Sequence, residues 1–250
     1  MHRRGWKTIY HNEVLARGMA ARTASEYMLQ RQRWAAGAMQ VLRRERVLTG
    51  GGLSLGQRLG YATTLWGWFD AWRSLGYIVL PIAVIATGGV PISASIWVFG
   101  PLFLATLGIQ FVALRLLARG HYPPVLSIMF EFLRMPAVLV GTLALVGVGG
   151  RSFRVTPKGA VQARRRRAPV PRMTIALLAV SALATAWFGL TLAGRTPFTY
   201  PLPAVAEGAF LFLGMNAAVL AGAAMRIRAP EFAPERRDGV RLPVILRGTV

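Results

Sequence analysis

The chain has 250 residues, 54% of them hydrophobic, and a formal net charge of +21 from 30 Lys and Arg against 9 Asp and Glu. This composition is too apolar for an ordinary soluble domain and predicts a mainly α-helical polytopic membrane protein. The basic residues lie between the apolar runs, as in cytoplasmic loops facing anionic lipid, and not in one stripe with interleaved aromatic residues, as nucleic-acid binding would favour. Since the chain has no cysteine, a disulfide framework and a Cys-ligated metal site are both excluded.

Residues 1–52 are polar, basic and helix-prone, and we expect them to be cytosolic, with a helix that Ser25 caps. In the stretch YMLQRQRWAAG, Gln30, Arg33 and Trp34 fall at i, i+3 and i+4 and share one helix face. Guanidinium matches phosphate oxygens and indole offers an apolar face to a sugar ring, so this group could grip a diphosphate and stack a sugar. The alternative, which these residues alone slightly favour, is an amphipathic surface helix with a buried Trp and a solvated Arg.

The next segments alternate between interface and membrane character. Residues 53–73 mix Trp and Arg with apolar residues, which is typical of a helix lying in the membrane interface. Residues 74–118 contain two apolar runs joined by GGVPIS and predict a transmembrane hairpin whose turn is non-cytoplasmic. Two apolar runs within residues 173–225 predict a second hairpin.

The apolar helix expected from Val125 to Val146 contains Glu131, Arg134 and Pro136. If it crossed the membrane, the arginine-rich block 151–172 would lie outside, against the positive-inside rule. We therefore expect this helix to lie along the cytoplasmic face. The chain then makes about four crossings of the inner (plasma) membrane, with both termini cytoplasmic.

Two further groups place basic residues in turn-forming sequence. The stretch RSFRVTPKG, Arg151–Gly159, is either an ordinary basic linker beside the membrane or a mobile flap over an anionic ligand. In ERRDGVRLPV, Arg237 and Arg241 lead into an apparent strand. Two arginines so spaced can clamp phosphates and stack on bases, although basic tails often contain such pairs.

Clustered carboxylates and histidines are missing from the pattern. The chain has two aspartates, Asp70 and Asp238, and dispersed glutamates, so nothing forms a DxD metal site or an acid/base pair. His2, His11 and His121 lack ligand spacing. The sequence therefore predicts no catalytic and no metal-binding residue in this chain.

In this order and spacing, the polar groups resemble the C-terminal part of a processive family 2 glycosyltransferase of the bacterial cellulose synthase type. The resemblance covers nearly the whole chain, and HRRGW near its start is similar to the stretch that follows the TED motif of that family. The matching residues are Gln30, Arg33 and Trp34 for QxxRW, Phe153, Val155, Thr156 and Lys158 for the FxVTxKG gating loop, and Arg237 and Arg241 for the RxxxR that opens a PilZ domain.

The resemblance implies a role for each group. Trp34 would stack on the acceptor end of a growing glucan, and Gln30 and Arg33 would help hold the donor pyrophosphate or the acceptor sugar. The gating loop would close over the UDP-sugar, with Thr156 and Lys158 nearest the nucleotide phosphates. The two arginines of RxxxR would bind cyclic di-GMP, an allosteric activator that releases the loop.

The resemblance also implies parts that this sequence does not contain. In the family, aspartates of the DxD and TED motifs bind Mg²⁺ or Mn²⁺ and deprotonate the acceptor hydroxyl. They would lie before Met1, and the PilZ barrel would continue after Val250. We therefore expect a fragment or truncated product of a longer enzyme, which would not catalyse transfer alone.

The expected fold is a helical membrane protein that carries the tail of a GT-A domain and the first strand of a PilZ β-barrel. The expected function is polymerisation of a UDP-sugar, UDP-glucose into β-1,4-glucan, and translocation of the polymer across the bilayer, with periplasmic or other synthase subunits as further partners. The alternatives are a non-catalytic membrane subunit of a polysaccharide synthase and an unrelated polybasic membrane protein. The expected segments are 1–52 (end of the GT-A domain), 53–73 (interface helix), 74–118 (hairpin), 119–150 (interface helix), 151–172 (gating loop and linker), 173–225 (hairpin) and 226–250 (start of PilZ).

Overall fold

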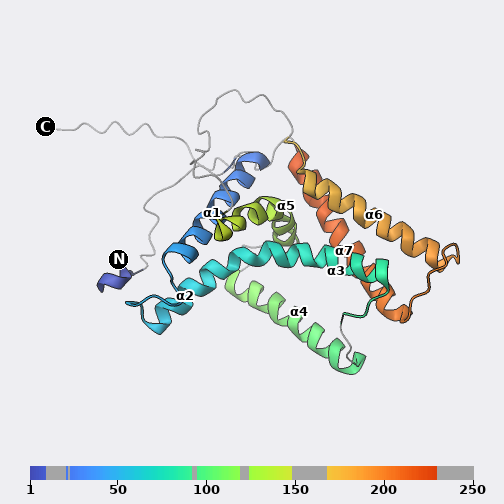
Figure 1. The fold of residues 1–250 in the computed structure, drawn as a ribbon, viewed down its shortest axis with the longest axis horizontal. Coiled ribbons are helices and arrows are strands. Elements are labelled where there is room, and N and C mark those ends of the chain that lie inside the picture. Colours follow the sequence, from blue (N-terminus) through green and yellow to red (C-terminus); the bar gives the residue numbers. More distant parts are fainter. Residues whose placement is uncertain (10–20, 22, 92–94, 119–123, 148–167, 230–250) are drawn as a thin grey trace.

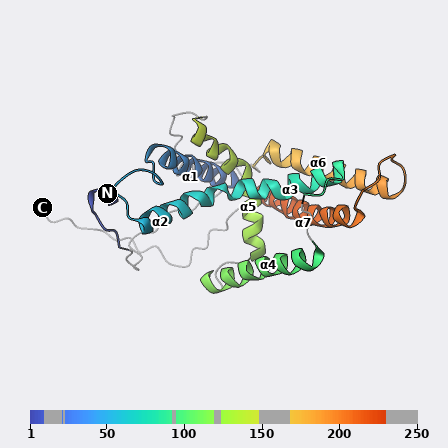
Figure 2. The ribbon, with the colours of Figure 1, turned by 60° about the horizontal axis from the view of Figure 1, so that its bottom comes forward.

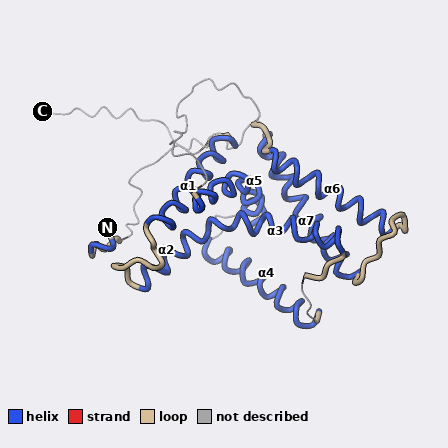
Figure 3. The backbone as a smooth tube through the Cα atoms, viewed as in Figure 1, coloured by secondary structure: helices blue, strands red, loops and turns tan. Residues whose placement is uncertain are grey.

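A computed structural model describes residues 1–9, 21, 23–91, 95–118, 124–147 and 168–229 (Figure 1). Within these ranges every regular element is a helix, joined by loops and turns (Figure 3). The prediction of a mainly α-helical chain is therefore confirmed. The α-helices are α1 (Ala24–Arg44), α2 (Leu55–Trp66), α3 (Asp70–Thr87), α4 (Ile96–Ala118), α5 (Pro124–Thr142), α6 (Arg172–Leu192) and α7 (Pro203–Arg228), and the short 3-10 helices are η1 (His2–Arg4), η2 (Gly67–Phe69) and η3 (Leu143–Val146).

Helix α1 is capped by Thr23, and the expectation that Ser25 caps it is wrong. Thr23 has an extended backbone, and its Oγ1 accepts a hydrogen bond from the Glu26 amide at 3.2 Å. Its carbonyl already accepts the Tyr27 amide at 3.0 Å, which starts the helical ladder. Because Ala24 is the first helical residue, Ser25 lies inside the first turn, where it cannot act as the cap.

Helices α2 and α3 form one helical run that bends at η2. Ser54 starts the run with a capping box, in which its side chain and that of Gln57 bond reciprocally to each other's backbone amides. Residues 73 and 74, between which the interface helix was expected to meet the transmembrane helix, both lie inside α3. The helix type changes over the three residues of η2, a tighter turn that links α2 to α3.

Helices α3, α6 and α7 pack together as an elongated bundle, in which α6 and α7 run side by side (Figures 1 and 2). Leu213, Leu220 and Ile227 recur every two turns of α7 and are fully buried. On α3, Ile78 and Ile85 repeat at the same spacing and are also fully buried. This regular spacing places one apolar stripe of each helix in the shared core.

Aromatic side chains close the end of the bundle near the α6–α7 loop. The Phe188 ring stacks on Phe210 with centroids 4.7 Å apart, and the Tyr200 hydroxyl donates to the Ile85 carbonyl at 3.0 Å. Burial raises the pKa of the Tyr200 phenol, while a hydrogen bond with Thr191 acts in the opposite direction. The hydrogen bond from Tyr200 to Ile85 holds the α6–α7 loop against the end of α3.

Helix α5 contacts α1, α3 and α7 and runs across the direction of the bundle (Figure 2). Phe132, Leu133, Met135 and Val138 of α5 are buried, so this helix joins α1 to the bundle. Helix α4 is apolar, lies apart from α6 and α7, and exposes large side chains such as Trp97 and Phe111.

Four helical stretches of the described residues are long and apolar enough to cross a membrane. They are Leu55–Thr87, Val125–Val146, Arg172–Leu192 and Pro203–Arg228. A shorter apolar stretch, Trp97–Ala113, lies in α4. Length and composition thus admit the α5 stretch as a span, whereas the charge of the following block favours the cytoplasmic face.

Candidate functional site

Helix α1 carries the predicted group of Gln30, Arg33 and Trp34, and all three residues lie within its regular turns. The Trp34 side chain is 46% exposed, and Gln30 and Arg33 are half-buried. The alternative of a surface helix with a buried Trp therefore does not describe α1. An exposed indole beside a guanidinium and an amide can stack a flat apolar face and bind oxygen atoms at its edge.

Arg31, which was not among the predicted site residues, has its guanidinium between two aromatic rings of α1. Its Cζ is 4.8 Å from the centroid of the Tyr27 ring and 4.7 Å from that of the Trp34 ring. Both distances are typical of cation–π contacts. Tyr27, Arg31 and Trp34 fall at i, i+4 and i+7, and this spacing in YMLQRQRW was the available signal. Arg31 thus holds the indole from one side.

Helix α1 rests on α5 through small residues. A Cβ added at Gly141 would lie 2.6 Å from the Gln32 carbonyl oxygen and 2.7 Å from the Ala35 Cβ. Real Cβ atoms do not approach other atoms so closely, so only glycine permits this crossing. The Tyr27 ring also meets Phe130 of α5 edge-on, with centroids 5.5 Å apart. The backbone of the QRQRW segment is therefore seated directly on α5.

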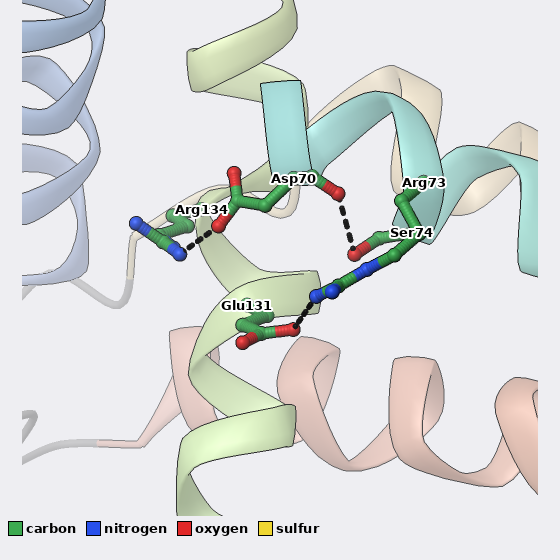
Figure 4. Close-up of polar contacts among 5 residues, drawn as sticks. All are labelled: Asp70, Arg73, Ser74, Glu131 and Arg134. Atoms are coloured by element: carbon green, nitrogen blue, oxygen red, sulfur yellow. Dashed lines mark hydrogen bonds and ion pairs between the residues drawn. The ribbon is translucent and has the colours of Figure 1, made fainter. Parts of the chain in front are cut away.

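On another side, α5 is tied to α3 by oppositely charged side chains (Figure 4). Arg134 donates to the Asp70 carboxylate, and Arg73 donates to the Glu131 carboxylate at 3.2 Å. The Ser74 hydroxyl donates to the Asp70 carbonyl at 3.1 Å within α3. The charges that interrupt the apolar sequence of α5 are therefore paired with charges of α3.

A neutral hydrogen bond extends the contact between α3 and α5. The Trp72 Nε1–H donates to the Thr142 hydroxyl at 3.1 Å, and that hydroxyl donates in turn to the Leu139 carbonyl at 2.7 Å. Thr142 is buried. Tryptophan is typical of the membrane interface, but Trp72 also has a hydrogen-bond partner in α5.

The described residues do not fit a divalent metal ion. No three His, Cys, Asp or Glu side chains of the described ranges come together as a ligand set. Asp70 is paired with Arg134, and Gln30, Arg33 and Trp34 of α1 supply hydrogen-bonding groups and a stacking surface but no carboxylate. The arrangement on α1 is suited to binding and orienting a ligand.

The other predicted site residues lie outside the described residues. These are Phe153, Val155, Thr156 and Lys158 of the gating loop, and Arg237 and Arg241 of the RxxxR pair. The same holds for the predicted PilZ strand after Arg228, and for His11, His121 and Asp238. The roles that the resemblance implies for these residues stay predictions.

No protein-family model matches the sequence. "Putative cellulose synthase 2" of Komagataeibacter xylinus is 29% identical over 198 residues, which is 76% of this chain and 13% of that protein. The "Cellulose synthase catalytic subunit [UDP-forming]" of Pseudomonas fluorescens is 30% identical over 166 residues, 64% of this chain and 22% of that protein. The protein of the same name from Komagataeibacter sucrofermentans is 36% identical over 95 residues, 38% of this chain and 13% of that protein.

The chain thus matches only a small part of the length of these much longer relatives. All three carry the cellulose synthase name, and the match to the first spans three quarters of the present sequence. The sequence of this chain is thus similar to one part of several proteins named as cellulose synthases.

Proposed function

We propose that this chain is the membrane-embedded part of a processive glycosyltransferase that polymerises UDP-glucose into β-1,4-glucan and moves the polymer across the inner membrane. The observation that carries the proposal is the exposed indole of Trp34, on the same helix face as Gln30 and Arg33, in a helix seated on α5, which in turn contacts α3 and α7. Similarity to cellulose synthases from three bacteria supports the substrate and the product.

In this proposal α1 orients the acceptor. The exposed indole offers a flat apolar face to the axial hydrogens of the terminal sugar, and the amide of Gln30 and the guanidinium of Arg33 bind hydroxyl or phosphate oxygens. Arg31 supports the indole from the side. None of these groups is a carboxylate, so the base that deprotonates the acceptor hydroxyl lies elsewhere in the synthase, in the same polypeptide or in a separate subunit.

Charge and packing support a membrane arrangement for this proposal. Helices α3, α6 and α7 would cross the bilayer, α4 would complete the first hairpin, and α5 would lie along the cytoplasmic face. Both termini of the chain would then be cytoplasmic. Two features support the position of α5: it packs along the polar helix α1, and it runs across the bundle direction (Figure 2). The arginine-rich block 151–172 then stays cytoplasmic.

The residues outside the described ranges complete the proposal. The Phe153–Lys158 segment would close over the bound UDP-sugar, with Thr156 and Lys158 at its phosphates. Arg237 and Arg241 would bind cyclic di-GMP and relieve the closed state. Both proposals rest on the match of these residues to the FxVTxKG and RxxxR patterns.

The test is Trp34→Ala in membrane vesicles from the native host, with the chain in its complete synthase. Incorporation of labelled UDP-glucose into alkali-insoluble, cellulase-sensitive polymer should fall at least about tenfold, the equivalent of about 1.4 kcal/mol in the transition state. Trp66→Ala is the matched control, because that indole is 74% exposed and lies on α2. Equal activity of the Trp34 variant and the unaltered protein would refute the acceptor role.

A further inference from the structure

The charges at the α3–α5 crossing have no part in the proposed binding of sugar or nucleotide. Charged side chains within apolar helices are costly to desolvate and are usually paired or functional. Here each charge on one helix meets an opposite charge on the other: Asp70 pairs with Arg134, and Arg73 pairs with Glu131 (Figure 4). On both helices the charged positions are three residues apart, so one face of each helix supplies both partners.

The two pairs differ in their surroundings. The Asp70 and Arg134 side chains are 16% and 21% exposed, whereas those of Glu131 and Arg73 are 33% and 48% exposed. The second oxygen of Asp70, Oδ1, is buried and has no hydrogen-bond partner among the described residues. Arg134 is therefore the main compensation for the Asp70 charge, and we assign the greater effect to this pair.

A continuous series of contacts leads from this crossing to Trp34. Phe130 precedes Glu131 on α5, and its ring meets the Tyr27 ring of α1. The Tyr27 ring stacks on the Arg31 guanidinium, which stacks on the Trp34 indole. Near the other end of α5, Gly141 seats the backbone of Gln32 and Ala35. A shift of α5 relative to α3 would therefore carry α1 and its indole with it.

We propose that Asp70, Arg73, Glu131 and Arg134 are positioning residues, which fix α5 against α3 and thereby set the place of the Trp34 indole relative to the membrane bundle. An ion pair suits this task, because opposite charges fix the register of two apolar surfaces that could otherwise slide. The part of this inference that concerns polymer synthesis rests on the proposed function. The part that concerns helix position stands independently of it.

The test of helix position uses the absence of cysteine in the chain. Spin labels on Gln40→Cys in α1 and Leu211→Cys in α7, both exposed positions, report the distance between α1 and the bundle in the membrane-bound synthase, in which any cysteine outside these 250 residues has been replaced by serine. Arg134→Asp should shift or broaden the distance distribution, and the exchanged pair Asp70→Arg with Arg134→Asp should restore it. Arg195→Asp, the same charge change in the exposed α6–α7 loop, should leave it unaltered. If Arg134→Asp prevents the protein from accumulating in the membrane, the neutral double variant Asp70→Asn with Arg134→Gln is measured in its place. This double variant should broaden the distance distribution.

Polymer synthesis is measured on the same variants without labels. Arg134→Asp should lower the maximal rate by more than about tenfold, because the indole that orients the acceptor is displaced. The exchanged pair should recover at least half of the parental rate, and Glu131→Arg should have a smaller effect than Arg134→Asp.

The outcomes separate the two proposals. An unchanged distance distribution in the reversed and neutral variants, or an exchanged pair that does not restore it, would overturn the positioning role. Restored distances with unrestored synthesis would overturn the link from position to catalysis. If membranes with the unaltered chain make no polymer from UDP-glucose, the proposed function fails, while the distance measurement still decides the positioning role.

Discussion

Gly141 of α5 meets the Gln32 carbonyl of α1 so closely that a methyl group has no room between the two helices. A Cβ at this position would lie 2.6 Å from that oxygen, which belongs to the backbone and cannot rotate away. The contact joins α1, the helix of the proposed acceptor site, to α5, which runs across the direction of the bundle. A single glycine thus sets the separation of α1 and α5.

Gly141→Ala is expected to push α1 away from α5. Overpacking of this kind typically costs about 1–3 kcal/mol, so thermal unfolding in detergent should begin at a lower temperature. Glucan synthesis should fall by a larger factor than the amount of folded protein, because the indole of Trp34 is displaced. Gly37→Ala on α1 is the matched control: a Cβ there meets nothing within 4 Å, and the better helix propensity of Ala should leave stability equal or higher. Normal synthesis by the Gly141 variant would contradict the close approach.

Arg31→Met should lower polymer synthesis although Arg31 is not one of the residues that match QxxRW. The substitution keeps most of the side-chain length and removes the cation that stacks on Tyr27 and Trp34. Loss of about 0.5–2 kcal/mol of cation–π energy would reduce the initial rate roughly 2- to 30-fold. Arg31→Lys keeps the charge without the planar group. Its rate of polymer synthesis should lie between that of the unaltered protein and that of Arg31→Met.

The control for this effect is Arg44→Met, which removes an exposed cation from the last turn of the same helix. It lowers the positive charge of α1 equally but touches neither aromatic ring. If both methionine variants lose activity to the same extent, net charge on α1 and not support of the indole is responsible.

Gly88→Ala is expected to destabilise the far end of the bundle. Gly88 ends α3 with φ +67°, and an added Cβ would lie 3.0 Å from both Phe198 Cζ and Pro201 Cδ. Gly194 has nearly the same φ, +66°, but a Cβ there meets nothing within 4 Å. Each alanine bears the backbone strain of about 1–2 kcal/mol, and only the Gly88 variant adds a clash with the aromatic loop. Gly88→Ala should therefore unfold at a lower denaturant concentration than Gly194→Ala. Equal losses of stability in the two variants would show that the α6–α7 loop moves away without cost.

The sequence by itself determined the helical content, the apolar stretches and the shared face of Gln30, Arg33 and Trp34, because these depend on periodicity and contacts within one helix. The contacts of Arg31 with Tyr27 and Trp34 also lie within one helix, so the i, i+4 and i+7 spacing of these residues was enough to predict them. Composition also fixed the membrane character, since apolar content and charge need no three-dimensional arrangement to be read.

Only the tertiary structure decided the partners of the charges and the place of the close backbone contact. Glu131 and Arg134 looked like interruptions of an apolar helix, and nothing near them in sequence indicates Arg73 and Asp70 as their partners. Likewise Gly141 gains its role only where α1 crosses α5. Which helix faces meet depends on how all the apolar stripes are buried together, and this is a property of the packed chain and not of any one segment.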